Sequence, residues 1–208
     1  MLELKPYELD EIILDHKARK GKEKFRAGSF SEKDVLVNLL PSAPYIGARY
    51  FYPSEYTKEH PYIKDVTFFA RSTVRNARIR LHFFEVGPDG KPGKDLANDT
   101  IIATVKKTGK LKEIKINLEK FDIRFPEAGL FVGLEWIIIP AHTLQYDKDK
   151  AFPEPGKNYL FQPGVGAARL QGKVDWSYNK EKWDLNKNAD ENRAKTFGAP
   201  AINLTLTD

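Results

Sequence analysis

The sequence predicts an all-β protein folded as an antiparallel β-sandwich, with one short helix near its N-terminus. Short segments in which apolar and polar residues alternate recur along the chain, and a period of two is typical of half-buried strands. Turns rich in Gly and Pro, of which the chain has 14 and 13, separate several of them. No ten-residue amphipathic helix is evident between these segments. This combination is typical of a sandwich or a barrel.

The N-terminal region is expected to hold the single helix. Segment 15–28 is charged and punctuated by Gly, which favours a linker. The helix is predicted over 31–40, where Ser31 is a suitable N-cap and Asp34 follows three residues later. Pro41 then ends it, because the residue before a proline avoids the helical conformation.

Seven strands follow from the alternation pattern. In 78–86, the side chains of Ile79, Leu81 and Phe83 share one face. Segment 130–139 is almost continuously apolar, which predicts a strand buried on both faces. The predicted strands are 45–52, 64–70, 78–86, 101–105, 110–118, 130–139 and 201–207.

Composition and charge exclude several classes of protein. The chain has no Cys, so it forms no disulfide framework and no Cys-ligated metal site. No apolar run approaches the roughly 18 residues of a transmembrane helix, and no signal peptide is visible at the N-terminus. The net charge of +5 is weak evidence for nucleic-acid binding. A basic cluster at 17–26 is predicted to be a solvated linker rather than a patch for nucleic acid or lipid, because Phe25 is its one aromatic neighbour.

Several segments carry a resemblance to a known family. A loop similar to the Gly-x-Pro-Gly-x-x-Leu loop of extracellular bacterial jelly rolls occupies 89–96, and a segment similar to their central strand occupies 128–136. Their closing segment is similar to 176–183 followed by the alternating strand 201–207. Segment 4–14 resembles the last strand of the carboxypeptidase-regulatory-like sandwich domains that precede such jelly rolls in Bacteroidetes envelope proteins.

This resemblance implies both an organisation and a role. Residues 1–44 are expected to comprise the end of a preceding sandwich domain, the basic linker and the short helix, and 45–208 to form the jelly-roll-like sandwich. The implied location is extracytoplasmic: the periplasm, the outer membrane or the cell surface. The implied role is a non-catalytic module that binds a glycan or an envelope protein, or that serves as a structural spacer. We expect no cofactor and no nucleic-acid partner.

Three aromatic residues form the best candidate binding site. Trp176, Tyr178 and Trp183 lie close together in a loop-rich part of the chain. Flat aromatic rings flanked by polar groups suit the apolar faces of sugars. The alternative is that these rings plug one end of the sandwich core.

Two further sites are predicted on the strands. Gly133 indicates a bulge or a close aromatic neighbour, and Glu135 on the same face is expected to form an ion pair. The alternative for Glu135 is catalysis, in a sandwich-fold glycan hydrolase that uses it with a second carboxylate. Arg78, Arg80 and His82 share the polar face of 78–86, so they form either an anion site or, as we favour, a solvated face.

Weaker candidates concern metal binding and modification. Asp147 and Asp149 have the spacing of two calcium ligands, although lysines interleave with them. No two of the four His residues have the spacing of a local zinc motif. Thr100 lies in an Asp-Thr-Ile sequence similar to the O-glycosylation site of Bacteroidetes envelope proteins.

Overall fold

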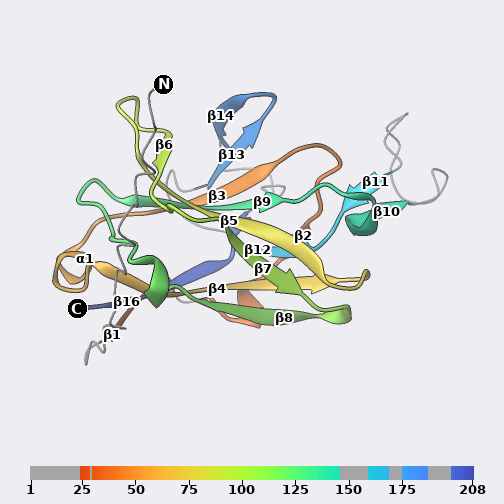
Figure 1. Ribbon diagram of the computed structural model, residues 1–208, viewed down its shortest axis with the longest axis horizontal. Coiled ribbons are helices and arrows are strands. Elements are labelled where there is room, and N and C mark those ends of the chain that lie inside the picture. The colour runs from red at the N-terminus through yellow and green to blue at the C-terminus, as the bar shows by residue number, and fades with distance from the viewer. Residues whose placement is uncertain (1–23, 29, 146–158, 169–174, 187–197) are drawn as a thin grey trace, which may run out of the picture.

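The computed structural model describes residues 24–28, 30–145, 159–168, 175–186 and 198–208. It consists of two antiparallel sheets of seven strands each that lie face to face (Figure 1), and a two-stranded sheet is separate from both. The fold class predicted from the sequence, an all-β sandwich, is therefore confirmed. No helix within the described ranges has the length and apolar character needed to cross a membrane.

The first sheet, sheet A, has the strand order β1-β16-β4-β12-β15, with β2 beside β12 and β8 beside β4. Its strands are β1 (Lys24–Ala27), β2 (Val37–Leu39), β4 (Tyr62–Ser72), β8 (Thr108–Asn117), β12 (Gly164–Ala168), β15 (Ala199–Pro200) and β16 (Ile202–Thr207).

The second sheet, sheet B, has the order β14-β13-β3-β9-β5-β6, with β7 beside β5. Its strands are β3 (Ile46–Phe51), β5 (Ala77–Val86), β6 (Pro92–Asp95), β7 (Ile101–Val105), β9 (Leu130–Trp136), β13 (Asp175–Asn179) and β14 (Lys182–Leu185). The remaining elements are the α-helix α1 (Glu55–Glu59), the 3-10 turns η1 (Glu32–Asp34), η2 (Glu119–Phe121) and η3 (Pro140–His142), and the strands β10 (Thr143–Gln145) and β11 (Tyr159–Phe161).

The hydrophobic core lies between the two sheets. Ile79, Leu81 and Phe83 point into it from β5, as their alternation predicts, and side chains such as Phe68 and Leu204 meet them from sheet A. Each fully buried side chain of this size contributes about 1.5–3 kcal/mol. Strand β9 is buried on both faces except at Glu135, which confirms the expectation for 130–136, but the strand ends there and Ile138 of the predicted segment 130–139 is exposed.

The helix predicted over 31–40 is wrong beyond its first turn. Ser31 and Asp34 do make the expected N-terminal hydrogen bonds, but the helical turn η1 ends at Asp34 and the chain then becomes extended. Strand β2 pairs with β12, so Val37–Leu39, within the predicted helix, form part of sheet A instead. Pairing with a strand distant in sequence has overridden the local signal.

The predicted boundary at residue 45 also changes. Strand β1 pairs with the C-terminal strand β16, and β2 pairs with β12, so described residues before Tyr45 belong to the sandwich. Lys24 and Arg26, expected in the linker, lie in β1. Phe25 stacks on Tyr56, with ring centroids 4.8 Å apart. Segments 1–23, with most of the basic cluster and the strand resemblance at 4–14, lie outside the described residues.

Candidate binding groove and the polar network beside it

The hairpin of β13 and β14 carries the three predicted aromatic residues. Trp176 and Tyr178 alternate with two buried residues of β13, and Tyr178 is paired with Trp183 of β14. Trp176 is paired with Ala48 of β3. When the pairing is followed from β3 across β9 to β5, Trp176 lies on the same face of sheet B as His82. The core residues of β5 occupy the opposite face. The three aromatic residues therefore lie on the outer face of sheet B and do not plug the core between the sheets.

The hairpin curls back over the sheet from which it starts. Strand β14 is four places from β5 in sheet B, a separation of about 19 Å in a flat sheet at about 4.8 Å per strand. Yet the ring centroids of Trp183 and Phe84 of β5 are 5.3 Å apart, in an edge-to-face arrangement. Figure 1 shows the hairpin standing above the layer that contains β3, β9 and β5. The curl encloses space between the hairpin and the outer face of the sheet.

Aromatic contacts hold the hairpin in this position. Trp176 meets Phe131 of β9 edge to face at 5.7 Å, and Trp183 meets both Phe84 and Tyr178 at 5.3 Å. Such pairs are each worth about 0.5–1.5 kcal/mol beyond their buried area.

Gly133 makes room for one of these rings. A Cβ atom at residue 133 would lie 3.0 Å from Cε2 of Phe84 and 3.1 Å from Cγ2 of Ile46. The close aromatic neighbour predicted for this glycine is therefore confirmed, and it is Phe84. With any larger residue at position 133, Phe84 and Ile46 would have to move by a few tenths of an ångström.

A surface groove lies between the hairpin and the turn that joins β5 to β6. Its volume is about 530 Å³. Salt bridges lie along it, from Lys91 to Asp89 at 2.8 Å and from Lys182 to Asp184 at 3.2 Å. Its lining comprises Asp89, Lys91, Pro92, Trp176, Tyr178, Glu181, Lys182, Trp183, Asp184 and Leu185. All three members of the predicted aromatic site thus meet here, each of them partly exposed.

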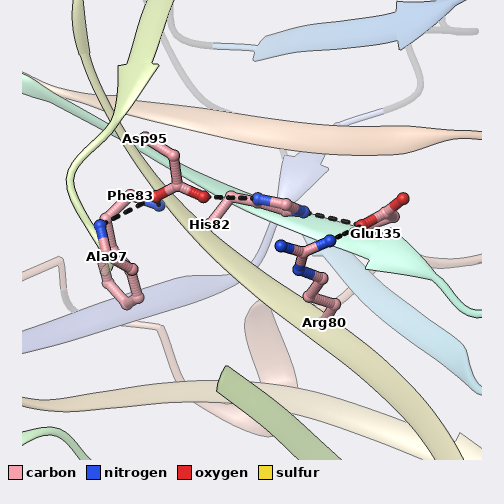
Figure 2. A network of polar contacts seen from close by, with 6 residues as sticks. All are labelled: Arg80, His82, Phe83, Asp95, Ala97 and Glu135. Atoms are coloured by element: carbon pink, nitrogen blue, oxygen red, sulfur yellow. Dashed lines mark hydrogen bonds and ion pairs between the residues drawn. The ribbon is translucent and has the colours of Figure 1, made fainter. Parts of the chain in front are cut away.

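A polar network adjoins the groove on the same face of sheet B (Figure 2). His82 lies between two carboxylates: Nδ1 is 2.7 Å from Asp95 and Nε2 is 2.8 Å from Glu135. Arg80 approaches Glu135 at 3.7 Å. The network of these four residues, the His82 network, joins β5 to β6 and β9.

The hydrogen bonds imply that His82 is charged. Each ring nitrogen faces a carboxylate oxygen, which only accepts, so both nitrogens must donate, and only the imidazolium has two N–H groups. Burial opposes this charge, but the hydrogen bonds to Asp95 and Glu135 outweigh it and raise the pKa of His82 above its ordinary value.

The two carboxylates are held in their ionised form. Burial acts to raise the pKa of Asp95, but the hydrogen bonds from His82 and from the backbone N–H groups of Phe83 and Ala97 lower it overall. The hydrogen bond from His82 is the largest influence on Glu135 and lowers its pKa; burial comes next and opposes it, and the charges of His82 and Arg80 add smaller effects that lower the pKa further.

The network also supports the wall of the groove. The His82 ring lies parallel to the Phe84 ring, with centroids 5.1 Å apart, and Phe84 contacts Trp183. His82 therefore connects two ionised carboxylates to an aromatic side chain that positions the groove.

The strand that carries Trp176 has a second polar cluster on its other side. Asn186 donates to the carboxylate of Asp175 at 3.0 Å and accepts from the Ser177 hydroxyl at 3.0 Å. Burial raises the pKa of Asp175 from 3.8 to about 6, against a smaller effect of the Asn186 hydrogen bond. The cluster holds the end of β14 against the start of β13.

The structure distinguishes among the other predicted sites. The ion pair expected for Glu135 is present, with His82 as an additional partner. The structure gives no support to the anion site, because His82 and Arg80 already face carboxylates within the protein; Arg78 is exposed on β5. The solvated face favoured for these residues is wrong at His82, which is buried.

The weaker candidates have separate outcomes. Asp147 and Asp149 lie outside the described residues. Within the part of the chain that the structure describes, His, Asp and Glu side chains form no group of three that could hold a metal ion. Thr100 is exposed in the turn before β7, so its hydroxyl is accessible.

Comparisons with known proteins add little to this geometry. No family model and no curated protein matches the chain. A solved structure that it resembles contains the cysteine protease and lectin-like domains of Cwp84, a surface layer associated protein of Clostridium difficile. The identity is 12% and the TM-score 0.48, and the match covers 86% of this chain but 37% of that one. At this similarity we draw no conclusion from it. The structure defines an antiparallel β-sandwich protein with an aromatic surface groove.

Proposed function

We propose that this chain is a non-catalytic β-sandwich module that binds a glycan in the groove formed by the β13–β14 hairpin. We further propose that it belongs to an extracytoplasmic protein of a bacterial envelope, which the family resemblance of the loop, strand and closing segments supports. The observation that carries the proposal is the meeting of Trp176, Tyr178 and Trp183 on one surface groove.

The groove has the properties that sugar binding requires. Pyranose rings have apolar faces that stack on aromatic rings and hydroxyl rims that hydrogen-bond to polar groups. Here the aromatic side chains are accompanied by carboxylates and lysines, and a volume of about 530 Å³ suits a short oligosaccharide segment. Phe84 and Phe131 hold the tryptophans in place before binding, which reduces the entropy lost when a ligand is ordered.

The geometry favours this proposal over the hydrolase alternative. A glycosidase needs a carboxylic acid that stays protonated, usually because its pKa is raised. The His82 network offers no such acid, because the hydrogen bonds from His82 help to lower the pKa values of both of its carboxylates, Asp95 and Glu135, against the effect of burial. If the binding test detects no glycan, docking of an envelope protein and a spacer role are the alternatives.

The test is tryptophan fluorescence titration against a panel of soluble oligosaccharides and polysaccharides. We expect a saturable change with at least one of them that is lost in Trp183→Ala and in Trp176→Ala. Tyr159→Ala is the matched control, because Tyr159 is an exposed aromatic residue on β11, outside the groove. No response to any glycan, or equal responses in all three variants, would refute glycan binding at this groove.

A further inference from the structure

The groove carries a charge of opposite sign to that of the whole protein. Its lining includes three carboxylates and two lysines, and so has one net negative charge, whereas the chain has a net charge of +5. The lysines are satisfied locally, because Lys91 is bound to Asp89 and Lys182 to Asp184. A neighbouring carboxylate therefore offsets the charge of each lysine.

Glu181 is the carboxylate that remains. It lies exposed at the tip of the hairpin, and among the described residues no side chain forms an ion pair with it. Both tip residues, Lys180 and Glu181, have left-handed backbone conformations with φ of 50° and 64°. The turn between Asn179 and Lys182 thus places an unpaired carboxylate beside the aromatic side chains of the groove.

An aromatic surface combined with a free carboxylate favours a cation. Ammonium groups are attracted to the faces of Trp and Tyr rings, and an ionised carboxylate adds a charge-assisted hydrogen bond. A uronic acid would instead bring a second negative charge close to Glu181 and Asp184. The attraction of an ammonium group and the repulsion of a carboxylate both favour a cationic glycan over an anionic one.

We infer that the groove selects glycans that contain amino sugars with a free ammonium group over neutral glycans, and excludes polyuronates. This inference rests on the glycan-binding function proposed above and names the substrate class of the same site. Non-specific attraction to a protein of net charge +5 would produce the reverse order, so a preference for a cationic glycan has to come from the groove itself.

The test compares three oligosaccharides of equal length: a β-1,4-linked glucosamine hexamer, its fully N-acetylated form and a galacturonic acid hexamer. Calorimetric titration is done at low ionic strength and about pH 5.5, which is above the ordinary pKa of about 4 for exposed carboxylates. We expect the glucosamine hexamer to bind about five- to tenfold more tightly than the N-acetylated hexamer, which is the size of effect that one exposed ion pair and one cation–π contact provide. The galacturonic acid hexamer should bind more weakly than either.

A substitution at Glu181 tests whether this side chain causes the preference for the glucosamine hexamer. In Glu181→Gln the ratio between the first two hexamers should fall to about twofold, and high salt should reduce it in the wild type. Glu113→Gln is the control, because Glu113 is an exposed carboxylate on β8 of sheet A. It should leave the ratio unchanged.

The outcomes separate this inference from the proposed function. Equal or tighter binding of the galacturonic acid hexamer, or a ratio that Glu181→Gln does not change, overturns the charge selectivity while glycan binding stands. Failure of all three hexamers to bind, or binding that survives Trp183→Ala, overturns the inference together with glycan binding at this groove.

Discussion

Replacing His82 should change how the stability of the sandwich depends on pH. Both ring nitrogens of His82 donate to carboxylates, so the folded state holds the imidazolium and the pKa of His82 is raised above its ordinary value of about 6.5. A group whose pKa is raised by folding stabilises the folded state fully when the pH is below its pKa in the unfolded chain. This contribution is lost as the pH rises through its pKa in the folded protein. Asp95 and Glu135 behave oppositely: their pKa values are lowered, so their contribution is lost only as the pH falls through those values. The His82 network is therefore fully charged between about pH 4 and 6.5.

The size of the effect follows from burial and from the number of bonds. Hydrogen bonds to charged groups contribute about 1.5–3 kcal/mol each, and His82 makes two. The side chains of His82, Asp95 and Glu135 are 9%, 26% and 36% exposed, so solvent screens the bond to Glu135 most. Asp95 also keeps two backbone donors when His82 is replaced. We therefore expect His82→Gln to lower the free energy of unfolding by about 2–3 kcal/mol at pH 5.5 and by about 1 kcal/mol at pH 8.5.

Urea unfolding of the wild type and the variant at both pH values measures this difference. Asp175 also titrates near this range, but it is present in both proteins and cancels in the comparison. Asp95→Asn should remove part of the same pH dependence, and the double variant should show less than the sum of the two effects, because the residues share one network. Parallel pH profiles for the wild type and His82→Gln would refute the charged network.

Three other substitutions test the structure around the groove. Asp175→Asn should leave stability unchanged near pH 4 and raise the free energy of unfolding by about 1–2 kcal/mol at pH 7.5. The reason is that the folded pKa of Asp175 is about 6, so ionisation of this carboxyl destabilises the fold as the pH rises through that value. Urea midpoints that shift equally at both pH values would contradict this. Gly133→Ala should cost about 1–3 kcal/mol through its contact with Phe84, whereas Gly109→Ala, which meets no atom within 4 Å, should be harmless in the same urea assay. Glu181→Gly should relieve the left-handed backbone and raise stability by about 1 kcal/mol while reducing the preference for the glucosamine hexamer to about twofold, and a loss of stability would count against the turn geometry.

The candidate site was partly visible in the sequence. Trp176, Tyr178 and Trp183 stood out as aromatic residues in a loop-rich segment, and the structure brings all three to one groove. Asp89 and Lys91 of the groove carried no such signal, because they belong to a turn far away in the chain. The involvement of Asp95 with His82 was likewise not predictable, since it depends on how β6 pairs with β5.

The missed strands have a common explanation. The strands that were not predicted, β1, β2, β6, β10, β11, β12, β13, β14 and β15, have two to five residues each, too few for a period of two to be convincing. Each is stabilised by a partner, such as β16 for β1 and β12 for β2, and not by its own sequence. The same cause explains why 31–40 was mistaken for a helix.

The sequence by itself determined the class of fold and the inward face of the long strands. Period-two alternation is a local property, so Ile79, Leu81 and Phe83 could be assigned to the core before any partner was known. Only the tertiary structure decided what covers the outer face of sheet B. His82 was expected to face solvent, but it is buried, and the β13–β14 hairpin curls over this face and places Trp183 against Phe84, which stacks on His82. That contact joins strands four places apart in the sheet, and its cause is the curvature of the sheet, which no local pattern of residues records.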